Sequence, residues 1–169
     1  MRSQLDEAWG FIRAFVKWVL IAAFIGGICG LVGAAFHVSV ERVTELRVQD
    51  PWLLFLLPAA GLAIALLYRI AGIEGAGTDD IINSIHNGNN VPLLLVPVIF
   101  AATVLTHLCG GSAGREGAAL QIGGGIGYGT GRLLHLGEKD LPLATLCGIR
   151  TAAAPIRLWL PRAGIQAYE

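Results

Sequence analysis

The chain has 169 residues, of which 54% are hydrophobic and only 14% are charged, and its formal net charge is zero. Soluble domains usually carry about a quarter charged residues, so this sequence lacks the polar surface that water requires. A zero net charge leaves no electrostatic footprint for nucleic acid, which excludes that class of partner. The three cysteines are widely spaced and form no CxxC pair, so we expect buried thiols and neither a disulfide framework nor a metal site.

Three apolar runs are long enough to cross a bilayer, which takes about 20 mostly apolar residues. They are Trp18–Phe36, Pro51–Tyr68 and Val91–Cys109. The first run is long for the core of a signal peptide, and Asp6 and Glu7 stand where such peptides are usually basic, so we expect a retained helix. The sequence therefore predicts an all-α, multi-pass integral membrane protein.

The polar segments between these runs predict where the helices end. A slight excess of cations in residues 1–17 favours a cytoplasmic N-terminus. The segment His37–Asp50 is expected to continue the first helix and to break before Pro51. Between Arg69 and Val91, a glycine turn leads into a short helix that Thr78 or Asp79 is expected to cap. A polar turn is expected at residues 138–140.

Small residues recur every four positions in two segments, which is the spacing that lets helix backbones approach closely in a membrane. The two series are Gly26, Gly30 and Ala34, and Gly123, Gly127 and Gly131. We expect both to be packing faces of a crowded helical bundle.

The stretch "GGSAGREGAALQIGGGIG", Gly110–Gly127, places an arginine and a glutamate among glycines directly after an apolar run. It contains no GxGxxG and no P-loop, and the chain has no HExxH. An enzymatic function is therefore not expected, and neither is a cofactor or a metal.

A helix that begins inside a bilayer offers an anion site built from backbone alone. Its first N–H groups have no partner within the helix, and the helix dipole adds positive potential there. Glycines give the backbone a sharp turn and leave room for an ion. Glu116 would lie in the first turn, where its carboxylate and an anion compete for one place, so its protonation or displacement would admit the anion. The alternative is that Glu116 is a helix-terminal carboxylate paired with Arg115.

The stretch "EGAGTDDIINSIH", Glu74–His86, repeats the pattern of a glycine turn followed by a short helix. Broken helices aimed at a midplane site are a common way for transporters to hold ions. Two such helix starts would converge on a single anion. Asp79 and Asp80 are otherwise expected to be solvated caps, and His107 is otherwise a hydrogen-bonded, buried histidine.

At Gly110–Gly127 the chain resembles the GREGP-containing motif of the CLC family of chloride channels and anion/proton antiporters. "GAGTD", Gly75–Asp79, falls where that family carries its GSGIP-like turn, and the order of apolar runs is similar over Val19–Ile149. The resemblance implies broken or re-entrant helices in the first half of an inverted-repeat fold. It also implies a homodimer in which each subunit holds its own anion pathway.

The resemblance implies a set of site residues. Glu116 would be the gating glutamate, and two stretches of backbone would line the anion. These are Arg115, Glu116, Gly117, Ala118 and Ala119 on one wall, and Gly75, Ala76 and Gly77 on the other.

The sequence departs from the family pattern in the glycine turn and in the glutamate motif. Ala76 replaces the usual serine, so a hydroxyl ligand for chloride is missing, Thr78 and Asp79 replace Ile-Pro, and Ala118 replaces the proline of GREGP. The sequence "THLCGGSAGREG" is similar to the corresponding motif in the branch of the family that exports fluoride in exchange for protons. Chloride is the default cargo, and fluoride stays open.

The family is built from two inverted halves, and the second contributes a GxFxP turn and a tyrosine to the ion site, which this chain does not contain. We expect a partial CLC-type transmembrane domain over residues 1–149. Residues 150–169 form an atypical tail with Arg150, Arg157 and Arg162. A truncated or frameshifted product is the expected explanation, with a membrane-surface tail as the alternative.

The sequence thus predicts transport of a small anion through a channel or an anion/proton antiporter of a lipid bilayer, expected to be the plasma membrane. One alternative is a fluoride/proton antiporter of the same family. The other is a half-domain that does not transport and only packs with a membrane partner, and an efflux assay in liposomes distinguishes it from a transporter.

Overall fold

The computed structural model describes the backbone of residues 2–87 and 91–166, and the side chains of residues 9–83 and 91–154. All regular secondary structure in those ranges is helical, which confirms the predicted all-α class. The elements are α1 (Arg2–Gln49), the 3-10 helix η1 (Pro51–Leu56), α2 (Leu57–Ile70), α3 (Thr78–Asn87), α4 (Leu95–Leu108), α5 (Arg115–Leu133) and α6 (Leu141–Gln166).

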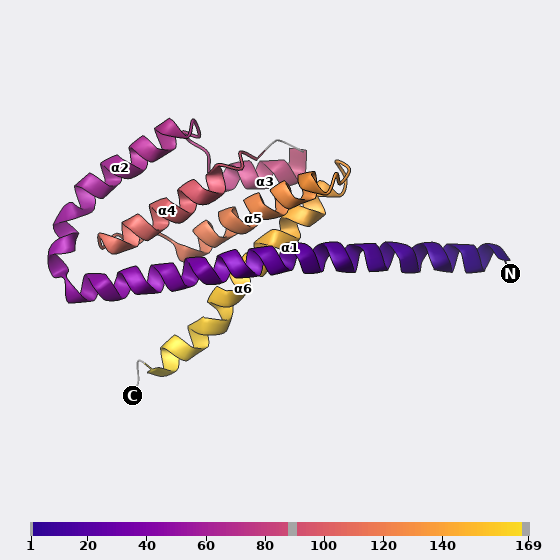
Figure 1. The fold of residues 1–169 in the computed structure, drawn as a ribbon, viewed down its shortest axis with the longest axis horizontal. Helices are drawn as coiled ribbons and strands as arrows, with labels where there is room; N and C mark the ends of the chain where they lie inside the picture. The colour runs from indigo at the N-terminus through magenta and orange to yellow at the C-terminus, as the bar shows by residue number, and fades with distance from the viewer. Residues whose placement is uncertain (1, 88–90, 167–169) are drawn as a thin grey trace.

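The first helix, α1, runs along the whole length of the molecule, and its N-terminal part extends beyond the other helices (Figure 1). Its 48 residues rise roughly 70 Å, which is more than twice the hydrocarbon thickness of a bilayer. It ends at Gln49, as expected, because a proline disfavours helical backbone in the residue before it. Asp50 accordingly has φ −120° and ψ 79°.

Two helical stretches are long and apolar enough to cross a membrane by length and composition, namely Trp9–Gln49 and Pro51–Ile70. Apolar side chains on them are widely exposed, with Phe11 at 76% and Phe55 at 87%. Both stretches contain runs that the sequence predicts as spans.

The third predicted span is wrong in length. Of Val91–Cys109, only the 14 residues of α4 are helical, and they rise about 21 Å, less than the hydrocarbon core. Pro92 has no N–H for a helical hydrogen bond, and α4 begins only at Leu95, which places Pro97 in the first turn, where the missing donor is tolerated. At the other end, Gly110 leaves the helix with φ +88°.

Small residues let α5 approach α6, as the spacing of Gly123, Gly127 and Gly131 predicts. A Cβ added at Gly123 would lie 2.5 Å from the Gly148 carbonyl oxygen, and one at Gly127 would lie 2.5 Å from the Ala144 carbonyl oxygen. The two backbones are therefore in direct contact. A turn at residues 138–140 joins these helices, as predicted.

The predicted small-residue face of α1 is correct for Gly26 and Gly30, which face Thr151 of α6. Its third member is Gly33 and not Ala34, because Gly33 is buried, whereas Ala34 is exposed.

With about 3.6 residues per turn, a residue seven positions on returns closer to the face of the first than one eight positions on. A Cβ added at Gly33 would lie 3.1 Å from the Ala152 carbonyl oxygen, so α1 also touches α6 through backbone.

The main core lies between α1, α3, α4 and α5, above α1 in Figure 1. Phe36 of α1 meets Phe100 of α4 edge to face, with 5.4 Å between ring centroids. Ile81 of α3 and Ile122 of α5 are buried in the same cluster. This core holds the starts of α3 and α5 on one side of the molecule.

The last helix, α6, crosses α1 and leads away from the bundle toward the C-terminus (Figure 1). It passes position 149 as one helix. The division into a domain over residues 1–149 and a tail over 150–169 stays a prediction, and the side chains of Arg157 and Arg162 lie outside the described residues.

Candidate functional site

The start of α5 has the backbone arrangement that the sequence predicts. The glycine loop ends at Gly114, whose backbone is extended with φ −64° and ψ 112°, and the helix begins at Arg115. Among the described residues, no side-chain cap is found at this end. The Ala118 N–H donates to the Gly114 carbonyl oxygen at 3.3 Å, so the N–H groups of the first three helical residues precede the helical hydrogen-bond ladder.

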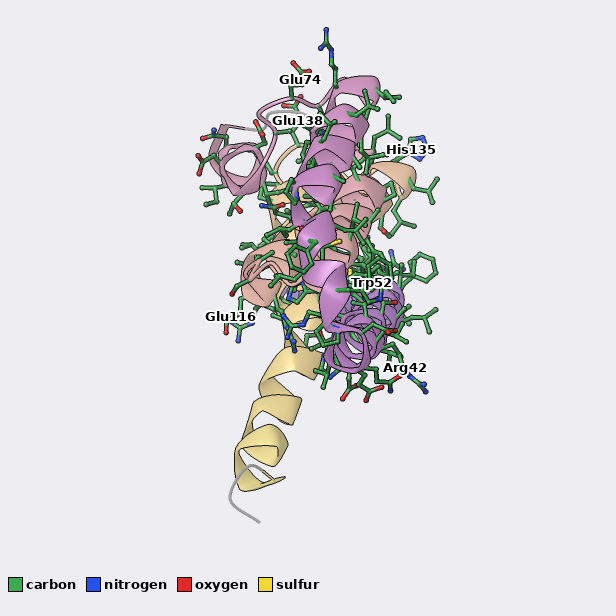
Figure 2. The ribbon with its side chains drawn as sticks, turned by 90° about the vertical axis from the view of Figure 1, so that its left-hand side faces the viewer. Arg42, Trp52, Glu74, Glu116, His135 and Glu138 are labelled. Carbon is green, nitrogen blue, oxygen red and sulfur yellow. The ribbon has the colours of Figure 1, made fainter. Side chains whose placement is uncertain are left out.

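Glu116 lies in the first turn of α5 and is exposed. Figure 2 shows its side chain pointing away from the helices. Within the described part of the chain, no ion pair joins Glu116 to Arg115, and the described ion pair links Arg69 to Glu74 at 4.0 Å. The carboxylate is therefore not held by the arginine beside it, which was the alternative drawn from the sequence.

Space is open around the glycines of this helix start. A Cβ added at Gly114 or Gly117 would meet nothing within 4 Å. Ala118 and Ala119 differ, because both are buried and Ala118 belongs to the main core. Their side chains anchor the helix, so any part they play in binding an anion would fall to their backbone.

The turn before α3 is also open in front of its glycines, but its N–H groups are partly used. A Cβ added at Gly75 or Gly77 would meet nothing within 4 Å, and Gly75 has φ +80°, which favours glycine. The Ala76 N–H donates to the Ile73 carbonyl oxygen at 3.0 Å, and the Gly77 N–H donates to Oδ2 of Asp80 at 2.8 Å. Two of the three predicted wall residues therefore have local acceptors.

The capping residue of α3 differs from the one predicted. The sequence favours Thr78 or Asp79, but α3 begins at Thr78, so Gly77 takes the cap position. Asp80, three residues on, reaches back to the Gly77 N–H, as the acidic member of a capping box does. Asp79 is exposed, as expected of a solvated carboxylate.

A hydrogen bond joins the start of α3 to the second turn of α5. Nε2 of Gln121, in α5, donates to Oγ1 of Thr78, the first residue of α3, at 2.6 Å. Gln121 was not among the predicted site residues, although a lone amide in the apolar run "AALQIGG" is a signal that could have found it. The first residue of α3 is thus held beside the second turn of α5.

The expectation of a buried, hydrogen-bonded His107 is confirmed, and the expectation of buried thiols is confirmed for two of the three cysteines. His107 is only 8% exposed, and its Nδ1 donates to the Thr103 carbonyl oxygen at 2.8 Å, because a carbonyl oxygen only accepts. Cys29 and Cys109 are buried free thiols, whereas Cys147 is half-buried.

Comparison with known proteins agrees with the resemblance seen in the sequence. A "Chloride/fluoride channel protein" of Pseudomonas syringae pv. tomato is 35% identical over 156 residues, which cover 91% of this chain and 34% of that protein. An "H(+)/Cl(-) exchange transporter ClcA" of Vibrio vulnificus is 27% identical over 165 residues, which cover 89% of this chain and 35% of that protein. A protein of the same description from Klebsiella pneumoniae is 35% identical over 125 residues, which cover 64% of this chain and 26% of that protein.

The chain thus spans about a third of the length of the curated relatives it matches most extensively. No solved structure matches it. Residues 59–154 match the family described as "Voltage gated chloride channel". That match includes the glycine turn, α3, α4, α5 and the first part of α6, and the chain belongs to this family of membrane transport proteins.

Proposed function

We propose that this chain forms one part of a pathway for a small inorganic anion, and that the start of α5 binds the anion. The observation that carries the proposal is the uncapped helix start at Gly114–Gly117, with the exposed Glu116 in its first turn. Unpartnered N–H groups and the helix dipole attract an anion, and the open space around the two glycines gives it access to the backbone.

Glu116 is the proposed gating and proton-coupling group. Its carboxylate and a free anion compete for the same N–H groups, so the carboxylate must be displaced or protonated when the anion binds. The exposed side chain in this structure supports displacement, since it leaves the helix start uncovered (Figure 2). Transport that depends on pH follows, because protonation removes the competing charge.

The start of α3 is proposed as the second wall of the site. The hydrogen bond between Gln121 and Thr78 supports this, because it fixes α3 beside α5. Since Asp80 already occupies the Gly77 N–H, the contribution of this wall comes from its open backbone surface and not from that donor.

Chloride is the default cargo and fluoride the alternative. The names of the relatives include both anions. Ala76 supplies no hydroxyl at the turn, which removes one ligand that the family offers to chloride. Parallel efflux measurements with chloride-selective and fluoride-selective electrodes decide between the two.

We further propose that the protein carrying this sequence is a homodimer in the plasma membrane and that it catalyses no chemical reaction. The exposed apolar side chains of α1, η1 and α2 support a lipid environment. The rival proposal is a unit that does not transport and only packs with a membrane partner. A transporter releases anion in proportion to the protein reconstituted, and a packing unit does not.

The test is anion efflux from liposomes that contain the natural protein, measured between pH 4.5 and 7.5, for the wild type and Glu116→Ala. We expect the wild type to release anion in a pH-dependent manner and the variant to lose that dependence. Glu138→Ala is the matched control, because it removes an exposed carboxylate at the other end of α5. An unchanged pH dependence in Glu116→Ala would exclude the gating role.

A further inference from the structure

A polar cleft of about 240 Å³ lies beside the start of α5. The residues that line it include Thr44 and Arg47 of α1, His107 of α4, Ser112 of the glycine loop and Arg115 of α5. None of the residues that line it is acidic. Three of these side chains are basic or imidazole groups that come from separate helices, and the proposed gate uses neither Arg47 nor His107.

The two arginines make the cleft attractive to an anion. Within the described part of the chain, neither Arg47 nor Arg115 has an ion-pair partner. Nη1 of Arg47 lies 3.7 Å from the place where a Cβ on Gly110 would be, and Gly110 has φ +88°. The guanidinium therefore rests on a turn that carries no side chain. An anion between two cations relieves their mutual repulsion.

His107 lines the cleft, and the hydrogen bond to Thr103 holds its imidazole ring in place. Because Nδ1 donates to Thr103, Nε2 is the ring nitrogen that remains for the contents of the cleft. A water molecule there can donate one proton to Nε2 and the other to an anion. The volume allows this, since a water molecule takes about 30 Å³ in the liquid.

We propose that this cleft is a second anion-binding subsite, which takes a small monovalent anion with part of its hydration shell. The cleft and the start of α5 share Arg115, so an anion held in the cleft lies next to the gate. The identity of the anion rests on the proposed function. The cleft would supply anion to the start of α5 from the side of the membrane on which α1 ends.

The test is isothermal titration calorimetry with sodium chloride and with sodium fluoride, on the natural protein purified in detergent without halide. We expect binding to the wild type in excess of one anion per chain. Arg47→Gln is expected to raise the Kd of one class of sites about tenfold or more, as the loss of a charge-assisted hydrogen bond does. Arg42→Gln is the control, since this exposed arginine of the same helix does not line the cleft (Figure 2).

Two further variants test the subsite even if Arg47→Gln fails to fold. Arg47→Lys keeps the charge and is expected to restore part of the binding, and Ser112→Leu fills the cleft from an exposed position. Binding that is the same in Arg47→Gln, Ser112→Leu and the wild type overturns the subsite. In that case pH-dependent efflux through Glu116 still stands, so the two proposals fail separately.

Discussion

Two regions of this protein are rich in glycine for different reasons. In the middle of α5, a Cβ added at Gly123 or Gly127 would lie 2.5 Å from a carbonyl oxygen of α6. At the start of the same helix, a Cβ added at Gly114 or Gly117 would meet nothing within 4 Å. The first pair lets two backbones touch, and the second pair leaves the backbone accessible. The four-residue spacing predicts the packing of the first pair, and the structure shows that the space around the second pair is open.

The largest expected effect comes from filling the packed region. Gly127→Ala places a methyl group against the Ala144 carbonyl oxygen and the Cα of Thr145, and backbone has little freedom to move away. We expect a loss of about 1–3 kcal/mol in the free energy of unfolding. The measurement is the Tm of the purified protein in detergent. Gly129→Ala on the same helix is the control, because its methyl group meets only the flexible end of Leu93 at 2.7 Å. Equal losses for the two variants would contradict the assignment.

An intermediate effect on stability is expected at the start of α3, where the carboxylate of Asp80 accepts a hydrogen bond from the Gly77 N–H. Asp80→Ala removes the acceptor of the Gly77 N–H and is expected to cost about 1 kcal/mol. Hydrogen exchange at the Gly77 amide should become faster in the variant. Asp79→Ala is the control, because its exposed carboxylate has no described hydrogen bond to this amide. Faster exchange in both variants would mean that charge near the helix end, and not the cap, protects Gly77.

The smallest effect on stability, with a clear effect on transport, is expected in the open region. Gly117→Ala is expected to leave stability unchanged or to raise it by about 0.5–1 kcal/mol, because alanine loses less backbone entropy in a helix. Anion efflux should fall, since the methyl group narrows the approach to the backbone. Gly61→Ala in α2 is the control, because its surroundings are equally open and it lies away from the site. Efflux that is the same in both variants would argue against an anion at Gly117.

Local features of the structure could be predicted from the sequence. The apolar run and the proline after it predict where α1 ends, and the glycine loop followed by "REGAALQ" predicts a helix start with Glu116 in its first turn. These depend on backbone preferences of neighbouring residues, which local sequence contains.

Features that depend on partners distant in sequence could not. The cap at Gly77 came from Asp80 because the register of α3 decides which carboxylate reaches back. The hydrogen bond from Gln121 to Thr78 requires that α3 and α5 lie side by side. The cleft that holds Arg47, His107 and Ser112 exists only where the ends of α1 and α4 meet the glycine loop.

The sequence by itself determined the helical class, the places where backbone turns, and the acidic group at the start of α5. Only the tertiary structure decided which helix the packed glycines meet, which helix start is capped by a carboxylate of its own helix, and which cations share a cleft. The physical reason is that a helix start depends on a few adjacent residues, whereas burial and charge pairing depend on how whole helices cross.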